Sequence, residues 1–88
     1  MTKEPNKNIV LTNHAKIKMK ERSISLSMVE KTIAKPDFTK TDNFDNQIIH
    51  YIKKFGKKYL RVLARIENDR IFVISTFFDR RIKEGDIK

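Results

Sequence analysis

The chain has 88 residues without cysteine, and its 20 lysines and arginines against 11 aspartates and glutamates give a net charge of +9 with neutral histidines. So short a chain holds one domain with one core, and the lack of cysteine excludes disulfides, thiolate zinc sites and cysteine nucleophiles. The charge makes polyanions the expected partners, although base composition of the genome alone could also produce a lysine-rich chain.

The chain divides by composition into an arm, one domain and a tail. We predict a loose polar arm at 1–8, the domain at 9–82 and a charged tail at 83–88. No run of 18 apolar residues occurs, and the start lacks the apolar segment of a secretion signal. We therefore expect a cytoplasmic protein that does not contact membranes.

Two helices are predicted before Pro36. Thr12 or Asn13 can cap a first helix that runs to about Arg22, because their side-chain oxygens accept the unpaired amide hydrogens of the opening turn. A second helix fits residues 25–34, and Pro36 ends it.

After Pro36 the apolar pattern changes from helical spacing to alternation, which is typical of strands. Strands are predicted at 38–41, 47–55, 59–66 and 71–78, the last two joined by a tight turn at 68–69. The expected fold is α+β, with two N-terminal helices packed on one side of a three- to four-stranded antiparallel sheet.

A stripe of three cations on the first helix is the main candidate site. His14, Lys18 and Arg22 stand at i, i+4 and i+8, so they share one face, which the helical wheel places toward the domain. Long basic side chains directed inward need an acid or an anionic ligand. The stripe therefore predicts a cationic groove that binds phosphate, with further charge from the predicted strands: Lys53, Lys54, Arg61 and Arg65.

Structural roles for the same residues remain open. His14 could cap the helix, and Arg22 could pair with Glu30 or with carbonyls at the helix end. His50 lies on an apolar strand and is expected to be a sheet residue, and two histidines without cysteines or paired acids do not make a metal site. We expect no metal and no cofactor.

Two segments resemble a known group of proteins. "LTNHAKIKMKERSIS", followed by "MVEKTI", resembles the opening of a family of uncharacterised domains with the pattern His-Ala-x-x-Arg-Met-x-Glu-Arg-Gly-Ile-Ser, and "YLRVLARIENDRIFVISTFFDRR" resembles its closing hairpin. On these motifs, which span Leu11 to Arg81, the chain is identified as a member of the RelE/ParE toxin superfamily. Two positions depart from the pattern: Lys18 replaces an arginine, and Ser23 replaces a glycine, so a left-handed backbone at Ser23 would be strained.

The resemblance implies a RelE-like fold and the toxin of a toxin–antitoxin pair, with a small acidic antitoxin as partner. The leading hypothesis is a metal-independent endoribonuclease that cuts mRNA, either free or on the ribosome, and so blocks translation. His14 would act as general acid or base, and Arg22 and Arg61 would stabilise charge on phosphorus. Further contacts to nucleic acid are predicted for Lys18, Tyr51, Lys53, Lys54, Arg65, Thr76, Arg80 and Arg81. The alternative is a non-enzymatic binding module, either a gyrase-inhibitor-like toxin or an inactive homologue.

Overall fold

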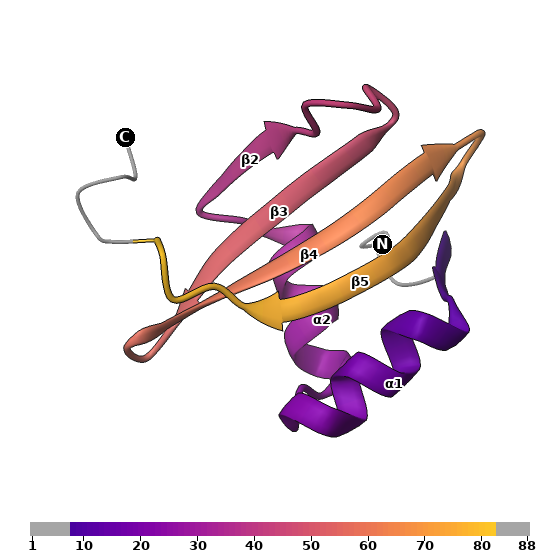
Figure 1. Cartoon of the computed structure of the whole chain (residues 1–88). Coiled ribbons are helices and arrows are strands. Elements are labelled where there is room, and N and C mark those ends of the chain that lie inside the picture. The colour runs from indigo at the N-terminus through magenta and orange to yellow at the C-terminus, as the bar shows by residue number, and fades with distance from the viewer. Residues whose placement is uncertain (1–7, 83–88) are drawn as a thin grey trace, which may run out of the picture.

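The computed structural model describes residues 8–82 as two helices and a five-stranded sheet (Figure 1). The predicted α+β class is confirmed. The predicted arm and tail lie, apart from Asn8, outside the described residues. In chain order the elements are β1 (Ile9–Leu11), α1 (Asn13–Arg22), α2 (Leu26–Ala34), β2 (Phe38–Thr41), β3 (Ile48–Phe55), β4 (Lys58–Glu67) and β5 (Arg70–Phe78).

The sheet has the strand order β1-β5-β4-β3-β2. The four strands predicted from the alternating pattern form its antiparallel part. The fifth strand, β1, was not predicted, and it pairs in parallel with the first half of β5. The sheet is therefore mixed and has five strands instead of three to four. Three residues are too few to show an alternating pattern, so only the pairing with β5 reveals β1.

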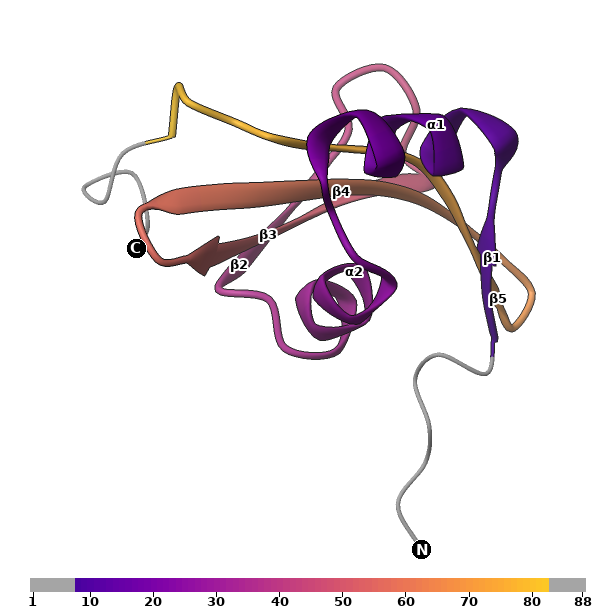
Figure 2. The same ribbon diagram turned by 90° about the horizontal axis from the view of Figure 1, so that it is seen from below.

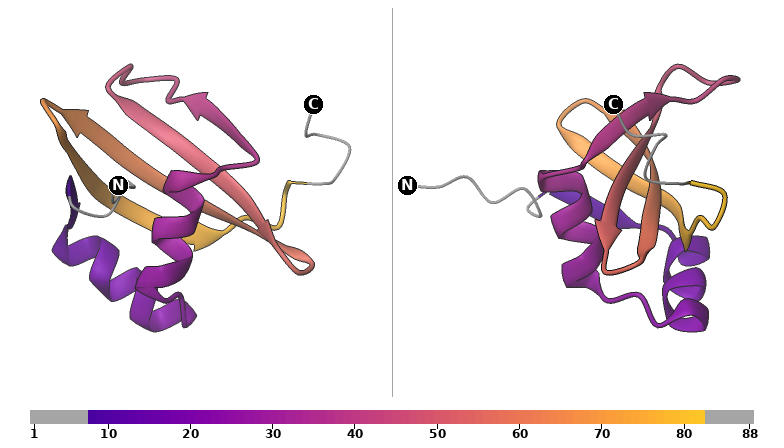
Figure 3. Two further views of the ribbon diagram at one scale, coloured as in Figure 1. Left: turned by 180° about the vertical axis from the view of Figure 1, so that it is seen from behind. Right: turned by 90° about the vertical axis from the view of Figure 1, so that its left-hand side faces the viewer.

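The two helices occupy different positions on the sheet. α2 packs against β3 and β4 on one face, which is seen from behind in Figure 3, left. α1 lies along β5 (Figure 2), and its Met19 joins Val29 of α2 in one buried cluster. The two helices thus pack on the sheet as predicted and share one core, with α2 covering a face of β3 and β4 and α1 lying at the β5 edge. α1 follows β1 in the chain and lies along the part of β5 that does not pair with β1.

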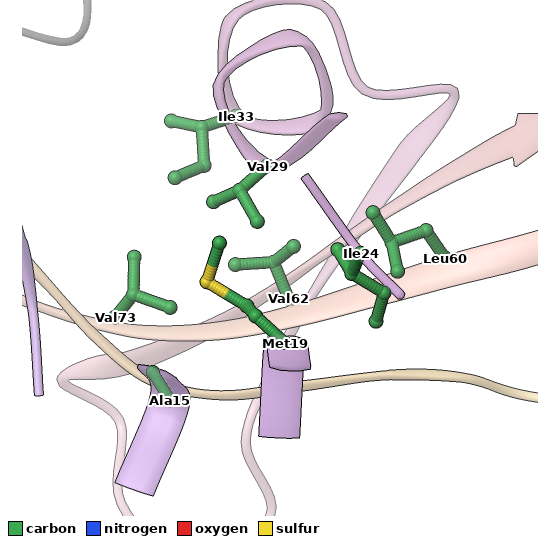
Figure 4. Close-up of a cluster of buried hydrophobic side chains, with 8 residues drawn as sticks. All are labelled: Ala15, Met19, Ile24, Val29, Ile33, Leu60, Val62 and Val73. Atoms are coloured by element: carbon green, nitrogen blue, oxygen red, sulfur yellow. The ribbon is translucent and has the colours of Figure 1, made fainter. Parts of the chain in front are cut away.

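The core lies between α2, α1 and one face of β4 and β5 (Figure 4). Ala15 and Met19 form the inward side of α1. These side chains meet residues from α2, the interhelical turn, β4 and β5: Val29, Ile33, Ile24, Leu60, Val62 and Val73. On β4, alternate side chains enter this core, as the sequence pattern predicted.

Both ends of α1 are fixed by hydrogen bonds that the sequence encodes. Thr12 accepts from the amide of Ala15 and donates its hydroxyl to the carbonyl of Val73 at 2.8 Å, so one side chain caps the helix and ties it to β5. At the other end, the amide of Ile24 reaches the carbonyl of Met19 at 2.8 Å, and Ser23 adopts the left-handed conformation with φ 57°. This is the Schellman arrangement, which favours glycine where Ser23 stands.

Replacing Ser23 with glycine should raise the free energy of unfolding by about 1 kcal/mol, because a left-handed backbone costs a residue with a Cβ roughly 1–2 kcal/mol and glycine loses part of that gain to its freer unfolded chain. In a domain of this size the midpoint of thermal unfolding should rise by about 4–8 °C. Asn68 has the same backbone conformation, with φ 56°. Because asparagine tolerates that conformation, Asn68→Gly is the control and should gain less. An equal or larger gain for Asn68→Gly in urea unfolding would contradict this account of Ser23.

The second face of the sheet, here called the open face, has no helix or strand over β3 and β4 within residues 8–82 (Figure 1). The strand register places Arg61 opposite Ile52 on β3 and opposite Phe77 on β5, so these side chains share the open face. His50, Lys54 and Arg65 also lie on it by the same register: His50 is opposite Leu63, Lys54 opposite Tyr59, and Arg65 opposite Phe72. The open face is therefore the place where polar side chains gather.

Candidate anion-binding site

A row of hydrogen-bonded side chains crosses the open face from the loop before β3 to the end of β5. Asp42 Oδ1 lies 2.8 Å from His50 Nε2, and His50 Nδ1 lies 2.7 Å from an Arg61 guanidinium nitrogen. Arg61 Nε then donates to Asp79 Oδ2 at 2.9 Å. The row thus joins four residues that are far apart in the sequence.

The row fixes the tautomer of His50. A guanidinium can only donate, so Nδ1 of His50 must accept and carries no proton. The proton of the neutral ring therefore sits on Nε2 and is donated to the Asp42 carboxylate. This hydrogen bond from His50, with backbone hydrogen bonds from Phe44 and Asp45, holds the pKa of the Asp42 carboxyl below its ordinary value despite some desolvation. Since both ring nitrogens are engaged, His50 has no free position for proton transfer, which agrees with its expected role as a sheet residue.

Asp79 ends the row as a nearly buried carboxylate, with a side chain that is 2% exposed. Burial by itself would raise the pKa of this carboxyl, but hydrogen bonds from the backbone and side chain of Arg81 and the charges of Arg61 and Arg81 outweigh burial and lower it. The Asp79 amide also donates to the Tyr59 carbonyl at 2.8 Å. Asp79 is therefore an ionised residue whose charge two arginines neutralise.

A pocket of about 310 Å³ opens beside Asp79, between the end of α1, the turn after β3 and the segment that follows β5. We call it the cation pocket because four of its lining residues carry positive charge: Arg22, Lys57, Lys58 and Arg80. Tyr59, Phe78, Asp79 and Ile82 complete the lining. Lys58 Nζ also lies 5.1 Å from the centre of the Phe78 ring.

The cations of the cation pocket have no carboxylate partner among the residues that the structure describes. The acidic residue that lines the pocket, Asp79, is already paired with Arg61 at 2.9 Å and with Arg81 at 3.3 Å. Among residues 8–82, an anion that enters the pocket therefore meets four cations and no free carboxylate, the arrangement that favours phosphate.

The stripe predicted on α1 is only partly brought to this pocket. Arg22 lines it, but His14 and Lys18 do not. His14 is exposed, and Lys18 is half-buried and pairs with Glu21 at 3.6 Å. The expectation that the stripe faces the domain is corrected, because the small side chain of Ala15 and the flexible one of Met19 form the packed side of the helix instead.

The other predicted site residues lie on different faces. Tyr51 and Lys53 are on the helix-covered face opposite Val62 and Leu60, where burial raises the pKa of the Tyr51 phenol and Lys53 donates to the Lys35 carbonyl at 2.9 Å. Thr76 is fully buried and donates to the carbonyl of Arg61 at 3.1 Å, so its hydroxyl is not available to a ligand.

The remaining predicted residues lie on the open face or at the cation pocket. Lys54 Nζ is 5.9 Å from the centre of the Tyr59 ring. Arg65 donates to Asp45 at 2.9 Å and to Gln47 at 3.1 Å. Arg80 lines the pocket, and Arg81 binds Asp79. The predicted catalytic set of His14, Arg22 and Arg61 is thus divided between the surface of α1, the pocket and the hydrogen-bonded row.

Lys57 and Lys58 are the site residues that sequence reasoning missed. Gly56, which has φ 64°, turns the chain between β3 and β4 and carries the two lysines to the end of the sheet. The "Gly-Lys-Lys" after a predicted strand could have marked a cationic turn. The two lysines lie near Arg22 only because α1 packs along β5, and no local sequence pattern shows that packing.

The described residues hold neither a metal-binding cluster nor a membrane-spanning helix. Within 8–82, no group of three or more histidine, aspartate or glutamate side chains is placed to hold a metal ion. None of the helices in this range is long and apolar enough to cross a membrane.

The chain matches a known family of domains. The family model described as "Domain of unknown function (DUF4258)" matches residues 11–78. No curated protein and no solved structure matches the chain significantly. The match extends from the last residue of β1 through the end of β5, so it covers the hydrogen-bonded row up to Arg61 and the part of the cation pocket formed by Arg22, Lys57, Lys58 and their neighbours in the chain up to Phe78.

Proposed function

The chain belongs to the DUF4258 family of domains of unknown function, and we propose from its site that it is an RNA-binding toxin of a toxin–antitoxin pair. In this proposal the cation pocket binds phosphates of RNA in the cytoplasm and the bound protein blocks translation. A small acidic antitoxin would neutralise it. The toxin class and the choice of RNA over DNA follow from the resemblance to the RelE/ParE superfamily.

The proposal rests on the convergence on one pocket of four cations that have no carboxylate partner within residues 8–82. Arg22 and Arg80 supply planar guanidinium groups that can bind two phosphate oxygens at once. Lys57 and Lys58 supply point charges. Arg61 acts indirectly, because by neutralising Asp79 it keeps a buried negative charge from opposing the ligand.

Metal-independent cleavage of the bound RNA is the second candidate. It is favoured by the same four cations, because attack of a 2′-hydroxyl on the adjacent phosphate places extra negative charge on phosphorus. Against it, neither histidine borders the pocket: His14 lies elsewhere on α1, and both nitrogens of His50 are occupied. We therefore propose binding as the primary activity.

Expression in cells and an RNA assay separate these candidates. Induction of the chain should arrest growth and lower protein synthesis, and Arg22→Ala should weaken both effects. Purified protein should bind single-stranded RNA and leave it intact in excess EDTA, with and without ribosomes. Cleavage in EDTA that His14→Ala abolishes would instead support the endoribonuclease. A chain that neither binds RNA nor arrests growth would overturn the proposal.

A further inference from the structure

Phe44 is the most exposed large apolar side chain within residues 8–82, at 97%. It stands in the loop between β2 and β3, formed by residues 42–47. This loop lies at the opposite end of β3 from the turn that carries Lys57 and Lys58 (Figure 1). The ring is therefore well separated from the cation pocket, and nothing in the core requires it.

The loop that carries Phe44 is held in one conformation. Asp42 accepts hydrogen bonds from the amides of Phe44 and Asp45 at 3.0 and 3.1 Å. Arg65 anchors the second half of the loop through Asp45 and Gln47. An aromatic ring on a loop held by hydrogen bonds loses little conformational entropy when it binds. Its contacts with a ligand therefore contribute more to affinity than those of a ring on a flexible loop.

The surroundings of Phe44 favour a nucleobase over an apolar protein surface. A protein anchor residue normally sits within a contiguous apolar patch, with other side chains that exclude water. Every other residue of the loop is polar: Asp42, Asn43, Asp45, Asn46 and Gln47. A base needs only one ring face to stack on, provided that cations hold the backbone of the same strand elsewhere.

The row on the open face connects this loop to the cation pocket. Asp42 begins the row within the loop, and Asp79, which ends it, lines the pocket. Arg61 neutralises Asp79 in this row, whereas Asp42, hydrogen-bonded to the neutral ring of His50, keeps its negative charge at the end nearest the loop. The eight residues of β3 span about 23 Å at roughly 3.3 Å per residue, a length that a strand of several nucleotides can bridge.

We infer that Phe44 is a base-stacking residue for single-stranded RNA whose phosphates occupy the cation pocket and whose chain crosses the open face. The inference rests on the proposed RNA binding and adds a second contact point to it. The ligand is then a single strand long enough to reach from the pocket to the loop. A double helix is excluded, because its bases are stacked on one another.

Fluorescence of a Phe44→Trp variant tests this directly, since the chain contains no other tryptophan. An oligouridylate of about ten nucleotides should quench the emission on binding, and an abasic oligonucleotide of the same length should bind without quenching. In parallel, Phe44→Ala should weaken binding of the oligouridylate about five- to a hundredfold. The dependence on salt concentration should stay unchanged, because no phosphate contact is lost.

Leu26→Ala is the matched control, since Leu26 is also exposed and apolar but begins α2 and should not affect RNA binding. Phe44 is almost fully exposed, so Phe44→Ala should fold normally. Equal RNA affinity of Phe44→Ala and the unmodified chain would overturn the inference. If Arg22→Ala still weakened RNA binding in that case, the proposed function would stand. Absence of RNA binding by the unmodified chain would overturn both.

Discussion

Replacement of Arg61 by alanine should lower the free energy of unfolding by about 3 kcal/mol, because removal of one partner from a buried ion pair leaves the other charge uncompensated. The side chains of Arg61 and Asp79 are only 15% and 2% exposed. The substitution also removes the donor to His50 Nδ1. In a domain whose total stability is on the order of 5 kcal/mol, this loss is large enough to populate unfolded protein.

Arg65→Ala is the matched control for Arg61→Ala. Arg65 also pairs with an aspartate at 2.9 Å, but both side chains are about one-third exposed, so the loss should stay below about 1 kcal/mol. Urea unfolding of both variants at neutral pH measures the difference. Arg61→Lys keeps the charge but lacks the planar guanidinium group. Its free energy of unfolding should therefore lie between those of Arg61→Ala and Arg65→Ala. Equal stability of Arg61→Ala and Arg65→Ala would show that the buried pair does not hold the sheet end together.

The effect of Arg61→Ala should also depend on pH. Because the pKa of Asp79 is lowered in the folded protein, its stabilising contribution is present above the unfolded value of about 4 and is lost as pH falls through the folded value. The difference between the unmodified chain and Arg61→Ala should therefore shrink below about pH 4. A loss of activity in Arg61→Ala is therefore expected to come from its lower stability and not from the loss of a catalytic group.

The second large effect concerns RNA binding by the cation pocket. If its four cations each contact a phosphate, the logarithm of the affinity should fall with the logarithm of salt concentration with a slope of about −2.8, or about fiftyfold between 0.05 and 0.2 M. Removing Arg22 and Arg80 together should reduce this slope by about 1.4. At low salt, where counterion release contributes most, the double variant should bind RNA much more weakly than the unmodified chain.

A second lysine cluster supplies the control for this double variant. Lys31 and Lys35 line a different pocket together with Lys53, at the end of α2. The variant Lys31→Ala with Lys35→Ala removes the same net charge as the pocket variant. It should leave the salt slope near that of the unmodified chain if binding is local. Similar losses in both double variants would mean that overall charge binds RNA and that the cation pocket has no special role.

Most of the fold could be predicted from the sequence because local patterns determine it. The caps and the alternating apolar residues defined the bounds of both helices and four strands to within one residue. Ser23 was expected to be strained if left-handed, and it has that conformation. What could not be predicted was tertiary: the parallel pairing of β1 with β5 and the position of α1 along the strand edge.

The candidate site was predictable only in its charge. The sequence singled out Arg22 and Arg80, both of which line the cation pocket, and Arg61 and Arg65, which share the open face. It could not show that Arg61 is bound by Asp79 and His50, because these partners are 18 and 11 residues away. Nor could it show that Lys57 and Lys58, not His14 and Lys18, accompany Arg22.

The most direct test of the central claim is a titration of isotopically labelled protein with single-stranded RNA, followed by the backbone amide signals in NMR spectra. If the cation pocket binds phosphate, the largest shifts should occur at Arg22, at Lys57 and Lys58, and in the segment 79–82. Shifts centred on Lys31, Lys35 and Lys53, or spread evenly over the lysines of the surface, would contradict it.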